Sequence, residues 1–260
     1  MNTIILISWL TIAIYFSIFL VVGNILKNNS IVDIGWGAGF VVVAITTLLV
    51  SNNFDIISII LTILVSVWGI RLSYHLFKRN AGKGEDYRYI AMRKRWGKHQ
   101  IIGSFINVYL MQAIMMALVS YGYVYGILQP DKVFSIWTVI GLIVWGIGIL
   151  FEVVGDRQLR NFIANNNGKE VLDTGLWKYT RHPNYFGEAT SWWGIFIIVL
   201  GSTGNILAII SPIVITVLVR FISGVPLLEK KMMQQDAYKK YAEKTSVFFP
   251  LPPKNKGGNK

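Results

Sequence analysis

Seven long apolar runs constrain this chain more than any other feature of its sequence. Each run is long enough, or nearly so, to cross a bilayer whose hydrocarbon core is about 30 Å thick. Charged residues make up 15% of the chain, whereas a typical soluble domain carries about 25%. The runs predict an all-α, polytopic membrane helix bundle with about seven transmembrane helices, at 3–23, 34–51, 54–77, 102–128, 134–155, 189–203 and 205–222.

We expect this bundle to form a single transmembrane domain over residues 1–250. The last two runs are separated only by residues 202–205, so a re-entrant hairpin over 189–222 is the alternative to two full spans. Residues 251–260 are rich in Pro, Gly, Lys and Asn, which is typical of disordered segments. They predict a disordered basic tail.

The basic residues predict how the bundle is oriented. Of the 25 Lys and Arg residues, 22 lie in segments that a seven-helix bundle places on one side, and Lys132 lies on the other side. Cytoplasmic loops of membrane proteins are enriched in Lys and Arg. We therefore expect the N-terminus outside, the C-terminus in the cytoplasm, and a multi-pass protein of the cell membrane. The same placement accounts for the net charge of +12 without a nucleic-acid partner.

Cysteine and histidine usage excludes several classes of chemistry. The chain has no Cys, which excludes disulfides, thiolate nucleophiles, iron–sulfur clusters and cysteine zinc sites. Its three His residues, His75, His99 and His182, are too few for the clustered ligands of a membrane di-iron enzyme. We therefore predict no metal site.

One polar segment stands directly before an apolar run. Residues 173–188 read Asp-Thr-Gly-Leu-Trp-Lys-Tyr-Thr-Arg-His-Pro-Asn-Tyr-Phe-Gly-Glu. A helix is expected to begin at the proline, and Asn184 and Glu188 then share one face of it at i and i+4. Arg181 and His182 stand just before this helix. Because unpartnered polar groups are costly beside lipid, we interpret the segment as part of a site.

Further polar residues accompany the apolar runs at the same side of the bundle. Glu152 and Asp156 share one helix face at i and i+4, and Asp33 stands at the mouth of the second run, where a helix N-cap is the structural alternative. Arg160, Arg181 and Arg220 are suited to binding phosphates. We expect these residues to line one cytoplasm-facing pocket. No Gly-x-Gly-x-x-Gly or Walker motif is present, so any nucleotide is held by a different arrangement.

These motifs together resemble a known family. Residues 173–188, Val-Asp-Ile-Gly-Trp at 32–36, Glu-Asp-Tyr-Arg at 85–88 and the segment 156–160 are similar to the bacterial membrane relatives of steroid 5-alpha-reductases. The resemblance covers nearly the whole chain. It implies a seven-helix, NADPH-dependent reductase, an oxidoreductase of lipid metabolism that acts on the conjugated C=C bond of an apolar lipid or steroid-like enone.

The resemblance also implies roles for individual residues. The matching positions of the cofactor site are Asp156, Arg160, Asn184, Glu188 and Arg220, and the neighbouring Glu152, Arg181, His182 and Tyr185 complete the predicted cofactor-binding set. Asp33 resembles the carboxyl group that addresses the substrate carbonyl. Where the steroid enzymes have a Tyr partner, this chain has Trp68, and Tyr74 or Tyr87 is the available substitute. We predict Asp33 and Tyr87 as the catalytic residues.

Two other functions fit parts of the sequence. Isoprenylcysteine and phospholipid methyltransferases, which use S-adenosylmethionine, also carry an Arg-His-Pro-x-Tyr segment like that at 181–185, so a membrane methyltransferase of a lipid or prenylated substrate is the first alternative. A non-enzymatic membrane protein is the second. The expected partners are an apolar small molecule or lipid and the bilayer. The sequence leaves the oligomeric state open.

Overall fold

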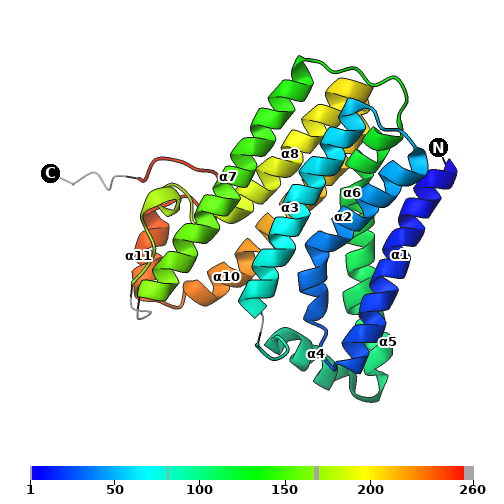
Figure 1. Ribbon diagram of the computed structural model, residues 1–260. Coiled ribbons are helices and arrows are strands. Elements are labelled where there is room, and N and C mark those ends of the chain that lie inside the picture. Colours follow the sequence, from blue (N-terminus) through cyan, green and yellow to red (C-terminus); the bar gives the residue numbers. More distant parts are fainter. Residues whose placement is uncertain (1, 81, 167–169, 255–260) are drawn as a thin grey trace. The chain divides into compact units, whose positions relative to one another are not determined.

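The computed structural model describes residues 2–80, 82–166 and 170–254 (Figure 1). Within these ranges the regular elements are helical, and the remaining pairing is an isolated bridge between Thr180 and Ser246. Six helical segments in the described ranges are long and apolar enough to cross a membrane. The chain is therefore a multi-pass helical membrane protein.

The described chain divides into two compact units, and each is treated separately. Unit 1 comprises residues up to Trp137 together with Val199–Ser211, and unit 2 comprises Thr138–Ile198 together with the residues from Pro212 onward. The expectation of one domain over 1–250 stays a prediction.

Unit 1 is built around its first helices. They are α1 (Asn2–Ile25), α2 (Ile31–Ser51), α3 (Ile56–Asn80), α4 (Tyr87–Trp96), α5 (Gln100–Ser104), the π-helical turn η2 (Phe105–Leu110) and α6 (Met111–Leu128). Their core includes the fully buried aromatic side chains Phe40, Trp68 and Tyr123. Trp68 stands edge-on to Phe40, with 5.4 Å between ring centroids. It is thus a core residue of α3.

Two glycines let α2 and α3 come into backbone contact. A Cβ atom added to Gly37 would lie 2.3 Å from the carbonyl oxygen of Gly69, and one added to Gly69 would lie 2.5 Å from that of Gly37. Close helix approach through small residues is common in membranes, where van der Waals packing drives association. One turn on, the Ala38 N–H donates to Ser73 Oγ at 2.8 Å.

The loops after α2 and α6 are joined by a buried lysine. The side chain of Lys132 is 0% exposed, and its Nζ lies 2.7 Å from Asp55 Oδ2. It also donates to the carbonyl oxygens of Gln129 and Ile127. Partial burial acts to raise the pKa of Asp55, but hydrogen bonds from Lys132 and Ser58 outweigh it and hold that pKa below its usual value.

Unit 2 is organised by two long helices, α7 (Ile136–Asn165) and α8 (Pro183–Thr203). The first two residues of α7 and the last five residues of α8 belong to unit 1. Gly141 and Gly148 on α7 face Gly194 and Gly187 on α8. A Cβ on Gly148 would lie 2.6 Å from the Gly187 carbonyl oxygen, and one on Gly194 would lie 2.7 Å from that of Gly141. The seven-residue spacing keeps the glycines on one seam.

The rest of unit 2 follows α8. It consists of α9 (Ile210–Val217), of which the first two residues belong to unit 1, the π-helical turn η5 (Leu218–Ile222), α10 (Val225–Met232) and α11 (Asp236–Lys244). A short 3-10 turn, η3 (Gly175–Lys178), precedes α8. Two regions separated by 65 to 68 residues in sequence are joined here. Thr180 Oγ1 donates to the Phe248 carbonyl, and the Arg181 N–H donates to that of Ser246.

The helices agree with most of the expected spans. The candidate spans are Ile5–Ile25, Ile31–Ser51, Ile56–Asn80, Tyr87–Leu128, Ile136–Asn165 and Ile206–Met232. The expected run 189–203 lies in α8, whose first turns include Asn184 and Glu188 and which is not among the six. A seventh span and the orientation of the termini therefore stay predictions. Residues 255–260 of the expected tail lie outside the described residues. Residues 251–254 have no regular secondary structure, and the N–H groups of Leu251 and Lys254 donate to the carbonyls of Tyr179 and Lys244.

Candidate functional site

Asp33 is held by two side chains of α4. Tyr89 Oη donates to Asp33 Oδ1 at 2.7 Å, and Arg88 Nη2 lies 3.5 Å from Asp33 Oδ2. The Asp33 side chain remains 22% exposed, while Tyr89 is buried. We call Asp33, Arg88 and Tyr89 the Asp33 cluster. It combines a carboxylate, a phenol and a cation at the first turn of α2.

The start of α4 decides which tyrosine meets Asp33. Asp86 caps α4 by accepting a hydrogen bond from the Arg88 N–H, so the helix begins at Tyr87. Residues two apart on a helix face different directions. Tyr87 is therefore 76% exposed, and Tyr89 is turned inward. The tyrosine that bonds Asp33 is therefore Tyr89, and a catalytic role for Tyr87 stays a prediction.

The loop before α4 is clamped to the loop before α2. Glu85 Oε1 accepts hydrogen bonds from the Asn29 N–H at 2.7 Å and from Arg93 Nη2 at 2.6 Å. The Asp86 N–H donates to Ser30 Oγ at 2.7 Å. Burial acts to raise the pKa of Asp86, but the bonds from Arg88 outweigh it, and the pKa lies below its usual value. The Glu-Asp-Tyr-Arg motif thus fixes α4 against the start of α2.

In unit 2, four of the predicted cofactor-binding residues come from the facing helices α7 and α8. Asn184 Nδ2 donates to Asp156 Oδ1 at 3.1 Å, and Glu152 and Asp156 are both buried on α7. Glu188 is half-buried, one turn beyond Asn184. We call Glu152, Asp156, Asn184 and Glu188 the α7–α8 cluster. Asn184 Oδ1 is buried and accepts no hydrogen bond from the described residues.

Arg181 and His182 meet a residue that the sequence interpretation did not include. Arg181 donates to both carboxylate oxygens of Glu229, through Nε at 3.1 Å and Nη2 at 2.9 Å. Its Nη1 donates to the carbonyl oxygens of Ala242 and Thr245. His182 Nε2 lies 2.7 Å from Glu229 Oε1.

Tyr238 completes this group. Its Oη donates to Glu229 Oε1 at 2.7 Å, and burial together with this bond raises the pKa of Tyr238 above its usual value. We call Glu229, Arg181, His182 and Tyr238 the Glu229 cluster. Its members come from the segment before α8, from α10 and from α11. A single acid among apolar and basic residues at 225–232 was the available signal for Glu229.

The remaining predicted residues of unit 2 lie as follows. Arg160 is exposed near the end of α7. Arg220 is half-buried in η5, with its guanidinium 4.9 Å from the ring centroid of Phe221. The ring of Tyr185 lies 5.9 Å from that of His182. The structure therefore pairs Asp156 with Asn184, and it places Arg181 and His182 together in the Glu229 cluster. Asp33 and Tyr87 belong to unit 1 instead.

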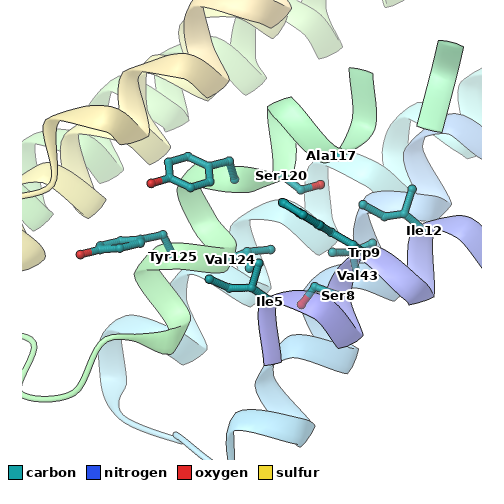
Figure 2. Close-up of a pocket in the computed structure, with 10 residues that line it drawn as sticks. Ile5, Ser8, Trp9, Ile12, Val43, Ala117, Ser120, Val124 and Tyr125 are labelled. Carbon is teal, nitrogen blue, oxygen red and sulfur yellow. The ribbon is translucent and has the colours of Figure 1, made fainter. Parts of the chain in front are cut away.

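A small pocket in unit 1 is separate from these clusters. Figure 2 shows Ser8 and Trp9 of α1, Val43 of α2 and Ser120 of α6 among the side chains that line it. None of the predicted catalytic residues lines this pocket. Among the described residues, no group of three or more His, Cys, Asp or Glu side chains has a metal-binding arrangement.

Comparisons with known proteins find one family pattern and several relatives. The sequence pattern of the family described as "Protein of unknown function (DUF1295)" matches residues 19–245. An uncharacterized protein of Schizosaccharomyces pombe, C594.04c, is 23% identical over 211 residues, which are 68% of this chain and 61% of that protein.

Two plant enzymes match a shorter stretch. The steroid 5-alpha-reductase DET2 of Solanum lycopersicum is 33% identical over 66 residues, which are 25% of this chain and 26% of the enzyme. The enzyme of the same name from Arabidopsis thaliana is 39% identical over 57 residues, or 22% of each chain. The chain thus matches about three fifths of the yeast relative and about a quarter of each plant enzyme. No solved structure matches this chain significantly.

Proposed function

Because this chain belongs to the DUF1295 family, and because two steroid 5-alpha-reductases are similar to part of it, we propose that it is a membrane reductase. The substrate class is an apolar lipid or steroid-like enone, whose conjugated C=C bond is reduced with NADPH. The cell membrane is the proposed location. The hydrogen bond from Tyr89 to Asp33 is the observation that carries the proposal.

The chemistry of enone reduction explains why that pair matters. Reduction adds a hydride to the β carbon and a proton to the α carbon, and negative charge develops on the carbonyl oxygen meanwhile. A hydrogen-bond donor placed at that oxygen stabilises the charge. We assign this role to the Tyr89 O–H, which turns from Asp33 to the carbonyl when substrate binds, while Arg88 balances the Asp33 charge.

The α7–α8 cluster fits the polar groups of a dinucleotide. The buried Asn184 Oδ1 offers an acceptor for an amide or hydroxyl donor, and Glu188 offers a second acceptor. Arg160 and Arg220 would bind phosphate oxygens. When bound, the cofactor would supply the hydride, and a proton taken up from solution would complete the reduction. Since four hydrogen bonds already engage Arg181 within unit 2, we assign it and His182 to positioning α8.

Ligand-dependent stability tests this proposal directly. The purified protein in mild detergent is heated with NADPH, NADH or S-adenosylmethionine. A ligand at about 100 times its Kd raises the free energy of unfolding by about 2.7 kcal/mol. We expect NADPH to stabilise the wild type and Glu188→Gln to abolish the effect. Asp236→Asn, which changes an exposed acid on α11, is the matched control and should respond like the wild type.

The other outcomes separate the alternatives. Stabilisation by S-adenosylmethionine alone would reject the reductase and favour a methyltransferase. Stabilisation by none of the three ligands would favour a non-enzymatic protein. If NADPH stabilises the protein, turnover of enone lipids, followed by loss of NADPH absorbance, identifies the substrate class.

A further inference from the structure

The basic residues of α4 and of the turn after it form two groups, one with acidic partners and one without. Arg88 and Arg93 turn their guanidinium groups inward to pair with Asp33, Asp86 and Glu85, although the Arg88 side chain stays 38% exposed. Lys94, Arg95 and Lys98 are exposed, and no ion pair involves them among the described residues. Glu85 and Asp86 are the only acids between residues 56 and 130. The inward cations are therefore neutralised, and the outward ones are not.

Apolar side chains accompany the outward cations. Ile90 is 40% exposed and Met92 is 39% exposed. We use the name basic face of α4 for the exposed side of this helix, from Ile90 and Lys94 round to Arg95 and Met92, together with Lys98 of the turn that follows. A helix that presents both Lys or Arg and apolar side chains to its surroundings is typical of segments that lie at the boundary between a bilayer and water. Long basic side chains can lie along apolar surface while their charged ends reach headgroups.

The chain path places this face at such a boundary. Gly97, with φ +53°, ends α4, and a 3-10 turn over Gly97–His99 leads into α5. The exposed side chains then become apolar, beginning with Ile101 and Ile102, which are 58% and 59% exposed. These residues open the apolar part of a candidate span. In Figure 1, α4 and α5 lie at the same end of unit 1.

We propose that the basic face of α4 binds anionic phospholipid headgroups at the membrane surface. Charge complementarity and continuity with a lipid-facing segment both favour this partner. Each cation near an anionic surface raises the ratio of membrane-docked to undocked α4 by roughly fivefold. Tyr89 and Arg88 of the same helix contact Asp33, so lipid binding at α4 stabilises the position from which they do so. This surface goes beyond the proposed reductase function and does not depend on it.

Because the sequence contains no Cys, a fluorophore attaches only at a Cys introduced for the test. Met92→Cys is labelled with a fluorophore and the full chain is reconstituted in vesicles of phosphatidylcholine, with or without phosphatidylglycerol. Nitroxide lipids that quench near the headgroup report contact. We expect stronger quenching with phosphatidylglycerol, and loss of that difference in high salt and in Lys94→Gln/Arg95→Gln/Lys98→Gln.

Two controls keep the outcome unambiguous. A label at Ile63→Cys, on an exposed position of α3, should be quenched equally in both vesicles and confirms that each variant inserts. Lys239→Gln/Lys240→Gln/Lys244→Gln removes the same charge from α11 and should leave quenching at position 92 unchanged. Equal quenching in both lipids would overturn the proposal, as would a lipid difference that survives the α4 substitutions. A label shielded from water but not quenched by lipid would also overturn it, and would indicate a protein partner.

Discussion

The Asp33 and Glu229 clusters use the same kinds of group in opposite ways. In the Asp33 cluster, one oxygen accepts a phenol O–H and the other faces an arginine at 3.5 Å. In the Glu229 cluster, the carboxylate receives two bonds from Arg181, one from His182 and one from Tyr238. A fully satisfied buried network fixes structure. A partly satisfied, accessible carboxylate retains capacity for a substrate.

The largest test of this difference is removal of Glu229. Its side chain is 14% exposed and that of Arg181 is 10% exposed, so Glu229→Ala leaves a buried cation without its partner. Such changes cost about 3–5 kcal/mol. We expect a loss of that size in the unfolding free energy measured in mixed micelles. Asp236→Asn, which breaks an exposed pair with Lys239, should cost little. Equal losses in the two variants would remove the distinction between the clusters.

Tyr89→Phe tests the other side of the comparison. If the phenol acts at the developing oxyanion, kcat should fall about 100-fold, as for loss of one oxyanion-hole donor. Tyr87→Phe is the matched control, because its side chain is 76% exposed, and it should keep kcat within about twofold of the wild type. Turnover of an enone under saturating NADPH measures both. A larger loss in Tyr87→Phe would restore the original prediction.

The α7–α8 seam sharpens the comparison, because it positions Asp156 against Asn184. In Gly148→Ala the new Cβ would lie 2.3 Å from Ser191 Oγ and 2.5 Å from the Ser191 N atom. Overpacking of this kind costs about 1–3 kcal/mol. Gly146→Ala, on the same helix, meets nothing within 4 Å and should be neutral or slightly stabilising. Measured unfolding free energies of the two variants test this difference, and equal values would contradict close packing at the seam.

Asp55 supplies the smallest effect, through pH. Its pKa is lowered in the folded protein, so its contribution to stability is present above the unfolded pKa of about 4 and is lost as pH falls through the folded pKa. Because Asp55 is 32% exposed and two backbone carbonyls also accept hydrogen bonds from Lys132, we expect no more than about 1 kcal/mol. The difference in unfolding free energy between the wild type and Asp55→Asn should shrink to zero at low pH. A difference that grows on acidification would contradict this.

The sequence predicted the helices better than the contacts between them. Apolar runs located six spans, because length and composition decide membrane crossing. The helix beginning at Pro183 was predicted, as was a shared location for Asp156 and Asn184. The end of α7 was placed ten residues too early, since residues 156–165 include six polar or charged side chains and yet continue the helix.

Long-range partners were the part that the sequence could not supply. Glu229 lies 48 residues from Arg181, and no local pattern links them. Tyr89 was overlooked because choosing between two tyrosines requires the first residue of α4, which Asp86 sets as the N-cap. Trp68, at the position expected for a catalytic tyrosine, proved to be packed against Phe40. Roles in catalysis and cofactor binding stay predictions for all of these residues.

The buried Lys132 affects the net charge at the place where two loops of unit 1 meet. It is the one basic residue in the loops that follow α2, α6 and α8, and Asp55 cancels its charge within the fold. The junction of the loops after α2 and α6 in unit 1 therefore carries no uncompensated cation. A positive charge appears at this junction only when Asp55 takes up a proton, so acidification changes the charge there although the lysine itself keeps its proton.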